Sequence, residues 1–267
     1  TLPRRPLEKR KLRYEDVYPV LYLKYRLSRQ AERSNIKHLV IDEMQDYSRL
    51  QYLIIRRMFS CKMTILGDRA QTMADQQQDV LQFLPGIFGK DLRRIEMRKS
   101  YRNTVEISDF ANEILRHGDF AIYPVEPVLR HGTTVQKEAF ADEAALLAAG
   151  VQKIKAWQEQ GYETIAVVCR DEAEAAAMAR KLKKYVPVVE EDLETAEFGE
   201  GVMVLPVAYT KGLEFDAVLL LDPTEEKYPE HDGQVQLLYV AATRALHELA
   251  VLYTGKLTGI LAKKAPK

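Results

Sequence analysis

The segment His38-Leu-Val-Ile-Asp-Glu-Met-Gln-Asp-Tyr-Ser48 joins a short apolar run to a cluster of acidic residues. Its apolar residues 39–41 predict a buried strand of a parallel sheet, and a helical pattern follows the acidic residues. Asp42 and Glu43 therefore fall at the carboxyl end of a strand. That edge is where α/β sheets place their ligands.

Two adjacent carboxylates at such a strand end suit a magnesium nucleotide. Asp42 can hold a hydrated Mg²⁺ ion, which keeps several of its waters, and Glu43 can orient or deprotonate an attacking water. The alternative is that the acidic residues between Asp42 and Asp46 cap the next helix, because acidic side chains favour a helix N-terminus. The motif alone favours the nucleotide interpretation and leaves the capping alternative open.

The bulk composition predicts a globular protein without a global electrostatic bias. The chain has 267 residues, which can form one large or two medium domains, and 46% of them are hydrophobic. Lys plus Arg equals Asp plus Glu at 39 each. No net field attracts nucleic acid or an anionic membrane, so any nucleic-acid binding must depend on local patches.

The cysteines and the ends of the chain predict a cytoplasmic setting. Cys61 and Cys169 each lie beside or within an apolar run, which predicts reduced core thiols and no disulfide framework. No apolar run reaches the roughly 20 residues of a transmembrane helix, and no signal peptide opens the chain, so we expect no membrane association. Because the first residue is Thr1, we expect a piece of a longer protein.

Strand-like and helical patterns alternate along the rest of the chain, as in an α/β protein. The best candidate domain boundary is the Gln-rich stretch 72–90, which contains Pro85-Gly86. The predicted strands are 63–66, 95–97, 134–140, 164–169, 202–205, 217–221 and 249–253, and the main predicted helices are 142–160, 172–185 and 236–245.

Two further polar clusters follow predicted strands. Gln71 comes shortly after Gly67-Asp68 and could reach a terminal phosphate or its attacking water, although Gly-Asp could equally form a simple turn. Tyr101 and Arg102 lie at a strand-to-helix turn, where the guanidinium can bind phosphate while the ring packs on a base. A surface arginine beside a structural tyrosine is the alternative.

Five segments in one order carry a resemblance to a known family. Together they resemble motifs II to VI of the UvrD/Rep-type superfamily 1 helicases, from residue 38 to about residue 253, and most of all the helicase-IV and HelD type, the latter being ATPases that bind bacterial RNA polymerase. The segments are Val40-Ile-Asp-Glu-Met-Gln-Asp46, Ile65-Leu-Gly-Asp-Arg-Ala-Gln71, Lys99-Ser-Tyr-Arg-Asn103, Lys211-Gly-Leu-Glu-Phe-Asp216 and Leu237-Leu-Tyr-Val-Ala-Ala-Thr-Arg-Ala245.

The resemblance implies a RecA-like fold of the P-loop NTPase type, with parallel sheet layers. Residues 1–90 would be the C-terminal part of a first RecA-like domain with motifs II and III. Residues 91–267 would be a second RecA-like domain with motifs IV, V and VI. The interval between motifs IV and V leaves no room for the 2B insertion of UvrD.

In the first domain the resemblance implies catalytic roles for three residues. Asp42 would bind Mg²⁺ through water, Glu43 would act on the hydrolytic water, and Gln71 would sense the terminal phosphate of ATP. Gln45 and Asp46 would couple this site to the moving interface.

In the second domain the resemblance implies contacts with the nucleotide. Tyr101 would pack on the adenine, and Arg102 would contact the γ-phosphate. Glu214, with Gly212 in the same motif, would help to hold the nucleotide. Arg244 would be the second γ-phosphate arginine.

Three departures from the family pattern affect the expected contacts with nucleotide and DNA. The phosphate loop Gly-x-x-x-x-Gly-Lys-Ser/Thr is absent, so we expect it in an N-terminal remainder of the same protein and expect this chain alone to be inactive. Residues 72–78 lack the aromatic that stacks on single-stranded DNA. The family's motif V Thr and His are replaced by Pro206 and Ala208, so we expect weak DNA contact.

The sequence thus predicts part of an ATP-hydrolysing motor that acts on DNA or on a nucleic-acid-bound complex. The alternative is a remodelling factor that binds RNA polymerase and uses nucleotide as a switch, with little or no unwinding. A degenerate domain without activity is disfavoured because the catalytic positions are retained.

Overall fold

The computed structural model describes residues 12–27, 35–71, 80–118, 125–189 and 199–262, without the side chain of Arg69. The chain divides into two compact units, one of residues 1–72 and 76–95 and the other of residues 73–75 and 96–267. The predicted segment 72–78 lies outside the described residues. The predicted domain division at residue 90 stays a prediction.

Unit 1 is built on a pair of parallel strands, β1 (His38–Ile41) and β2 (Lys62–Ile65), which are in register from end to end. Its helices are α1 (Tyr14–Leu27), α2 (Arg49–Met58) and α3 (Val80–Phe88), and its short 3₁₀ turns are Met44–Asp46, Arg69–Gln71 and Gly89–Asp91. A core of Ile41, Tyr52, Val80, Phe83 and Leu84 joins α2 and α3 to the strands.

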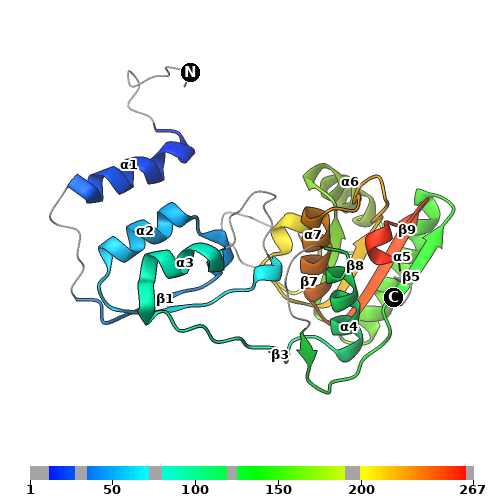
Figure 1. Ribbon diagram of the computed structural model, residues 1–267. Helices are drawn as coiled ribbons and strands as arrows, with labels where there is room; N and C mark the ends of the chain where they lie inside the picture. Colours follow the sequence, from blue (N-terminus) through cyan, green and yellow to red (C-terminus); the bar gives the residue numbers. More distant parts are fainter. Residues whose placement is uncertain (1–11, 28–34, 72–79, 119–124, 190–198, 263–267) are drawn as a thin grey trace. The chain divides into compact units, whose positions relative to one another are not determined.

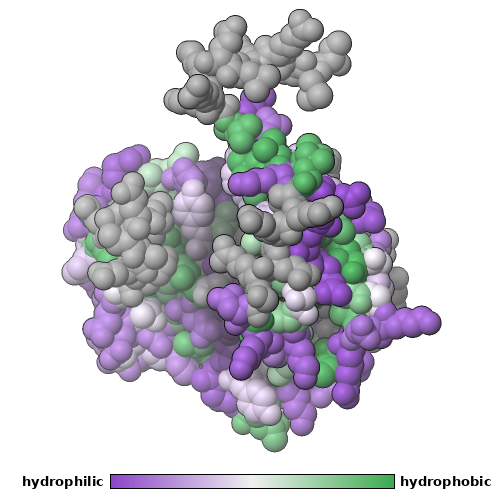
Figure 2. All heavy atoms as spheres, turned by 90° about the vertical axis from the view of Figure 1, so that its left-hand side faces the viewer, coloured by the Kyte–Doolittle hydropathy of each residue, from purple (hydrophilic) through white to green (hydrophobic). Residues whose placement is uncertain are grey.

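One face of the two-stranded sheet is exposed. Ile41 is buried, but the side chain of Val40 is 60% exposed, so the predicted burial of strand 39–41 is wrong for that residue. The described helices that share the core with β1 cover only one face, and alternate residues of a strand point to opposite faces. Helix α1 also carries exposed aromatic and aliphatic side chains; they are Tyr14, Val17, Val20, Leu23 and Leu27. Hydrophobic surface gathers in the upper part of Figure 2.

Unit 2 contains a five-stranded sheet in which every pairing is parallel (Figure 1). The strand order is β5-β9-β8-β6-β7, which confirms the predicted parallel α/β class. The strands are β5 (Gln136–Phe140), β6 (Thr164–Cys169), β7 (Gly201–Pro206), β8 (Phe215–Leu221) and β9 (Ala245–Thr254).

A short parallel pair, β3 (Lys99–Ser100) with β4 (Glu126–Pro127), lies apart from this sheet. The predicted strand at 95–97 is wrong, because Ile95 and Met97 are exposed and belong to no strand. An apolar run forms a strand only where a partner strand satisfies its backbone groups.

The helices of unit 2 cover the sheet on both faces. Helices α5 (Glu143–Glu159) and α6 (Glu172–Leu182) share one core with the sheet, in which Trp157 is only 2% exposed. Helix α7 (Asp232–Thr243) packs on β8 and β9, and α4 (Val105–Leu115) packs on α7. Asp142 caps α5, since its carboxylate accepts from the N–H of Ala145 at 2.8 Å.

The thiols of Cys61 and Cys169 are both free, as predicted, and Cys169 is buried. Within the described part of the chain, no helix is both long enough and apolar enough to cross a bilayer.

Candidate functional site

The carboxyl ends of β1 and β2 bring two polar turns together in unit 1. Beyond the strands, the N–H of Leu66 donates to the carbonyl of Ile41 and the N–H of Met44 donates to the carbonyl of Leu66, both at 2.8 Å. These bonds place Asp42 and Glu43 beside Gly67-Asp68. The carboxyl edge of this sheet, where the sequence predicts a ligand site, therefore carries both the Asp42-Glu43 turn and the Gly67-Asp68 turn.

Glu43 adopts the left-handed backbone conformation, with φ 50° and ψ 50°. Such a conformation costs a residue other than glycine on the order of 1–3 kcal/mol, and it concentrates at functional sites. The carboxylate of Asp42 accepts from the N–H of Glu43 at 2.8 Å. The acidic residues do not cap α2; Ser48 does, in a capping box with Gln51, so the capping alternative for this motif is wrong.

A chain of hydrogen bonds joins Glu43 to Gln71. The amide of Gln45 donates to the Glu43 carboxylate, and its carbonyl accepts from the N–H of Asp68 at 3.1 Å. The Asp68 carboxylate in turn accepts from the side chain of Gln71 at 3.0 Å. The structure therefore brings two predicted catalytic residues into one network and adds Asp68, for which the sequence pattern predicts only a turn.

Gly67 makes room for this network. A Cβ atom at this position would lie 2.5 Å from the side-chain oxygen of Gln45 and 2.6 Å from the backbone nitrogen of Met44. From the other side, the buried hydroxyl of Tyr52 donates to the carbonyl of Met44 at 3.0 Å, and burial raises the pKa of that phenol. The loop that carries Glu43 is thus held by backbone, side-chain and packing contacts.

The residues of unit 1 suit a hydrated Mg²⁺ ion and no protein-only metal cage. Among the described residues no group of three or more His, Cys, Asp or Glu side chains could hold a metal. Asp42 is exposed, however, and Mg²⁺ is commonly bound by one or two carboxylates together with waters and substrate phosphates. Asp42 can supply that single carboxylate.

In unit 2 the predicted site residues gather at the amino ends of the strands of the five-stranded sheet. Glu214 and Arg244 directly precede β8 and β9, whose first residues, Phe215 and Ala245, are paired in register. Both therefore lie at the amino ends of neighbouring strands. Arg102 joins them through an ion pair with Glu214 at 2.7 Å, in which both side chains are partly exposed.

Arg244 is buried and hydrogen-bonded within unit 2. Its side chain is only 1% exposed, and it donates to the carbonyls of Val240 and Leu213, both at 3.1 Å, and to the hydroxyl of Thr243 at 3.2 Å. Leu213 is adjacent to Glu214. The structure therefore brings Arg102, Glu214 and Arg244 together.

Two more predicted site residues are near neighbours of this cluster in the sequence: Tyr101 precedes Arg102, and Gly212 lies shortly before Glu214. The Tyr101 side chain is 74% exposed beside Arg102, so its ring face is open to a stacking partner. Gly212 has φ +80°, which favours glycine, although a Cβ there would meet no atom within 4 Å. Backbone conformation alone accounts for this glycine.

The segment 207–214 links the two edges of the sheet in unit 2. Pro206, at the end of β7, is level with Cys169 at the carboxyl end of β6, whereas β8 begins at the amino edge. The hydroxyl of Tyr209 donates to the Glu172 carboxylate at the start of α6, while Glu214 pairs with Arg102. The segment therefore crosses the sheet between these two anchors.

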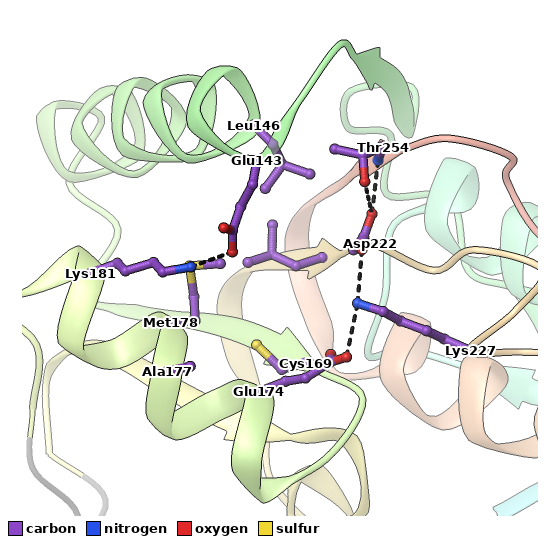
Figure 3. A pocket seen from close by; sticks show the side chains of 11 residues that line it. Glu143, Leu146, Cys169, Glu174, Ala177, Met178, Lys181, Asp222, Lys227 and Thr254 are labelled. Carbon is purple, nitrogen blue, oxygen red and sulfur yellow. Dashed lines mark hydrogen bonds and ion pairs between the residues drawn. The ribbon is translucent and has the colours of Figure 1, made fainter.

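A pocket of about 230 Å³ lies at the carboxyl edge of the same sheet (Figure 3). Lys227 bridges Asp222 at 2.8 Å and Glu174 at 2.9 Å, and Lys181 pairs with Glu143. Burial opposes ionisation of Asp222, but its hydrogen bonds, first from Lys227, outweigh burial and lower its pKa. The charged groups of the pocket thus satisfy one another, and none of the predicted site residues lines it.

Comparison with known proteins identifies the family. Residues 12–73 match the family model of the UvrD/REP helicase N-terminal domain, and residues 201–252 match that of the UvrD-like helicase C-terminal domain. The solved C-terminal domain of a possible DNA helicase from Lactobacillus plantarum WCFS1 is 30% identical, with a TM-score of 0.52, over 61% of this chain and 93% of that chain. This chain belongs to the UvrD-like helicases.

Two other proteins extend the comparison. R568 of Acanthamoeba polyphaga mimivirus, named as an inferred ATP-dependent DNA helicase, is 25% identical, and the match covers 87% of this chain. The chain spans 37% of the length of that relative. A solved structure of a PRRSV helicase is 16% identical over 82% of this chain and 35% of that chain, with a TM-score of 0.43. The predicted superfamily 1 helicase family and RecA-like fold are confirmed; the helicase-IV or HelD subtype stays a prediction.

Proposed function

We propose that this UvrD-like chain is part of an ATP-hydrolysing motor that acts on DNA. The observation that carries the proposal is the hydrogen-bond chain that joins Glu43, through Gln45 and Asp68, to Gln71 at one strand edge. A general base and a group that contacts the terminal phosphate must be held together for phosphoryl transfer, which depends on positioning and electrostatics.

The proposed roles follow from the position of each residue. Asp42, exposed at the strand end, holds Mg²⁺ through water, and ATP supplies the phosphoryl group when bound. Glu43 accepts a proton from the attacking water, in an orientation that the Gln45 amide fixes. Gln71, tied to Asp68, contacts the terminal phosphate.

In the second unit two arginines supply positive charge to the reaction. Arg102 and Arg244 contact the terminal phosphate, Glu214 holds Arg102 in place, and the exposed ring of Tyr101 packs on the adenine. For Arg244 this role requires at least one of its present carbonyl contacts to be exchanged, since its guanidinium is buried in the structure.

A further part of the same protein completes the nucleotide site. It carries the phosphate loop that these 267 residues lack. The exposed face of the two-stranded sheet in unit 1, with Val40 and Leu66 uncovered, supports this proposal, because parallel sheets are normally covered on both faces.

The free thiols suit a reducing compartment such as the cytoplasm.

Turnover by the full-length protein tests the proposal. We expect Glu43→Gln to abolish phosphate release, and Arg102→Ala or Arg244→Ala to lower kcat by on the order of 10³ to 10⁵ with a much smaller change in nucleotide affinity. Arg98→Ala is the matched control, because Arg98 is an exposed arginine of the same unit that pairs with Glu96 at 3.0 Å. Equal losses of affinity and rate would assign the arginines to ground-state binding.

The chain alone provides a second test. Half of the site is present in it, so we expect no steady phosphate release from the purified 267-residue chain. Hydrolysis that disappears in Glu43→Gln would contradict this expectation, because the variant excludes a contaminating ATPase.

This chain lacks two contacts with single-stranded DNA that the resemblance leads us to expect, and their absence bears on the substrate of the motor. An aromatic stacked on a base contributes roughly 1–3 kcal/mol. Pro206 is buried, Ala208 offers only a methyl group, and 72–78 holds no aromatic. Losing one or two such contacts weakens strand binding by one to several orders of magnitude, since about 1.4 kcal/mol is tenfold. We therefore propose that the motor binds single-stranded DNA weakly.

Titration of a labelled oligonucleotide against the full-length protein at physiological salt, with a parallel strand-displacement assay, decides between the substrates. Weak binding with little unwinding, together with ATP-dependent release of RNA polymerase from DNA, would favour the remodelling alternative of the helicase-IV or HelD type. Submicromolar, ATP-modulated binding with efficient unwinding would establish an ordinary DNA helicase.

A further inference from the structure

The side chain of Asn103 is hydrogen-bonded to the backbone on both sides of Arg244. Its buried side-chain amide, in a residue 5% exposed, donates to the carbonyl of Thr243 at 3.1 Å and to the carbonyl of Ala245 at 2.6 Å. The carbonyl of Arg244 itself accepts from the N–H of Phe215 at 2.9 Å. The carbonyls of Thr243 and Arg244 at the end of α7, and of Ala245 at the start of β9, are therefore all hydrogen-bonded, although the end of a helix leaves its last carbonyls without internal partners.

Asn103 also follows Arg102 directly in the sequence. The carbonyl of Arg102 accepts from the side chain of Arg130, and the same Arg130 side chain donates to the carbonyl of Leu246 at 2.6 Å. The loop that carries Arg102 is thus fastened to the α7–β9 turn by two neighbouring side chains. Of these two side chains, Asn103 makes the hydrogen bonds nearest to Arg244 in the sequence.

These contacts form a closed circuit. Arg102 pairs with Glu214 at 2.7 Å, and the adjacent carbonyl of Leu213 accepts from Arg244 at 3.1 Å. Arg244 is flanked by the two carbonyls that bind Asn103, and Asn103 returns the circuit to Arg102. Movement of one arginine loop therefore strains contacts with the other.

We propose that Asn103 is a positioning residue that fixes the spacing of Arg102 and Arg244 for the reaction. The inference rests on the proposed function of these two arginines. An amide carries two N–H donors, so it can bind two carbonyl acceptors at once, which a carboxylate cannot do. A misplacement of about 1 Å in catalytic groups can cost on the order of 10² in rate, so a residue that sets their spacing affects kcat without touching the nucleotide.

Asn103→Asp in the full-length protein tests the proposal, because the change keeps the shape of the side chain and removes both donors. Asn112→Asp is the matched control. Asn112 lies on α4 of the same unit and clasps a backbone in the same way, donating to the carbonyl of Val125 at 2.9 Å and accepting from its N–H at 3.0 Å. We expect Asn103→Asp to lower the thermal midpoint at least as much as Asn112→Asp, because it removes two donated hydrogen bonds of a buried side chain and Asn112→Asp removes one. Only Asn103→Asp should lower kcat, by about 10²-fold, with KM nearly unchanged.

A second comparison separates positioning from loss of structure. In an Arg244→Ala background Asn103→Asp should add less than about threefold to the loss, because residues that act as a unit are not additive. Asn103→Ser, whose hydroxyl reaches one carbonyl at most, should show an intermediate loss of kcat and serves if Asn103→Asp does not fold.

Full kcat in Asn103→Asp, or an equal loss in Asn112→Asp, would overturn the inference. If instead Arg102→Ala and Arg244→Ala leave turnover unchanged, the proposed function of the arginines fails first. The two failures are therefore distinguishable.

Discussion

Replacement of Gly67 by alanine should disrupt the loop that carries Glu43. The added Cβ would lie 2.4 Å from the Cγ of Met44, 2.5 Å from the side-chain oxygen of Gln45 and 2.6 Å from the backbone nitrogen of Met44. A rotamer change can move a side-chain atom, but no rotamer change moves a backbone nitrogen. The two turns must therefore separate.

The contacts that would be lost set the size of the effect. Separation breaks the bond from Met44 N–H to the Leu66 carbonyl, at 2.8 Å, and the bond from Asp68 N–H to the Gln45 side chain, at 3.1 Å. At about 1 kcal/mol for each bond and about 1–3 kcal/mol for overpacking, we expect a destabilisation of about 3–5 kcal/mol. Because whole domains are stable by about 5–15 kcal/mol, much of unit 1 should open.

Hydrogen exchange of peptides that cover β1 and β2 measures this local loss. Gly86→Ala is the control, because a Cβ at Gly86 in α3 would meet no atom within 4 Å and alanine favours a helix by about 1 kcal/mol. Trp157, the only tryptophan, lies in unit 2, and its fluorescence should report an unchanged unit. Equal exchange in the Gly67→Ala and Gly86→Ala variants would refute the reasoning.

Three further predictions concern unit 2 and the thiols. Trp157→Ala should cost about 3–5 kcal/mol, because it empties a core site that is 2% exposed, and circular dichroism should show a thermal midpoint lower by roughly 10 °C. Burial raises the pKa of Cys169 from 9.0 to about 12, so iodoacetamide at pH 8 should label Cys61 far faster than Cys169; comparable labelling would contradict the buried position. The pKa of Glu106 falls from 4.5 to about 2, first through its hydrogen bond with His131 and then through the backbone, so its contribution to stability is complete above pH 4.5 and is lost as the pH falls through about 2. Glu106→Gln should therefore lose less stability than the wild type between these pH values in an acid titration of the thermal midpoint, and identical curves would exclude the pair as a source of acid sensitivity.

The strands of unit 2 could be predicted from the sequence because their patterns are local. The run 164–169 is apolar after Thr164, and β6 occupies those same residues with almost every side chain buried. Asp142 caps α5 as its position before an Ala-rich helix predicts. The run 95–97 shows the limit of this method, because whether a strand forms there depends on a partner that the local pattern cannot reveal.

The site could be predicted in part. The positions of Asp42 and Glu43 follow from the end of a strand, and the resemblance supplied the roles of Arg102 and Arg244. The left-handed backbone of Glu43 and the two-sided grip of Asn103 depend on residues up to 142 positions apart in the sequence, so no local pattern contains them. Gly67, which the sequence predicts only as part of a turn, marks a close approach of backbone that is recognisable only beside Met44 in space.

The segment 207–214 should resist changes of length. Six residues of β6 rise about 20 Å, and this segment must return across that distance with only the short 3₁₀ helix Val207–Thr210, whereas a crossover between parallel strands usually contains an α-helix. An insertion or deletion here would shift β8 along its neighbours, and a shift of one residue would turn its buried face toward the other side. Among relatives and in engineered libraries, the loops that enter α5 and α6 should therefore tolerate insertions, while the distance between Pro206 and Phe215 stays constant.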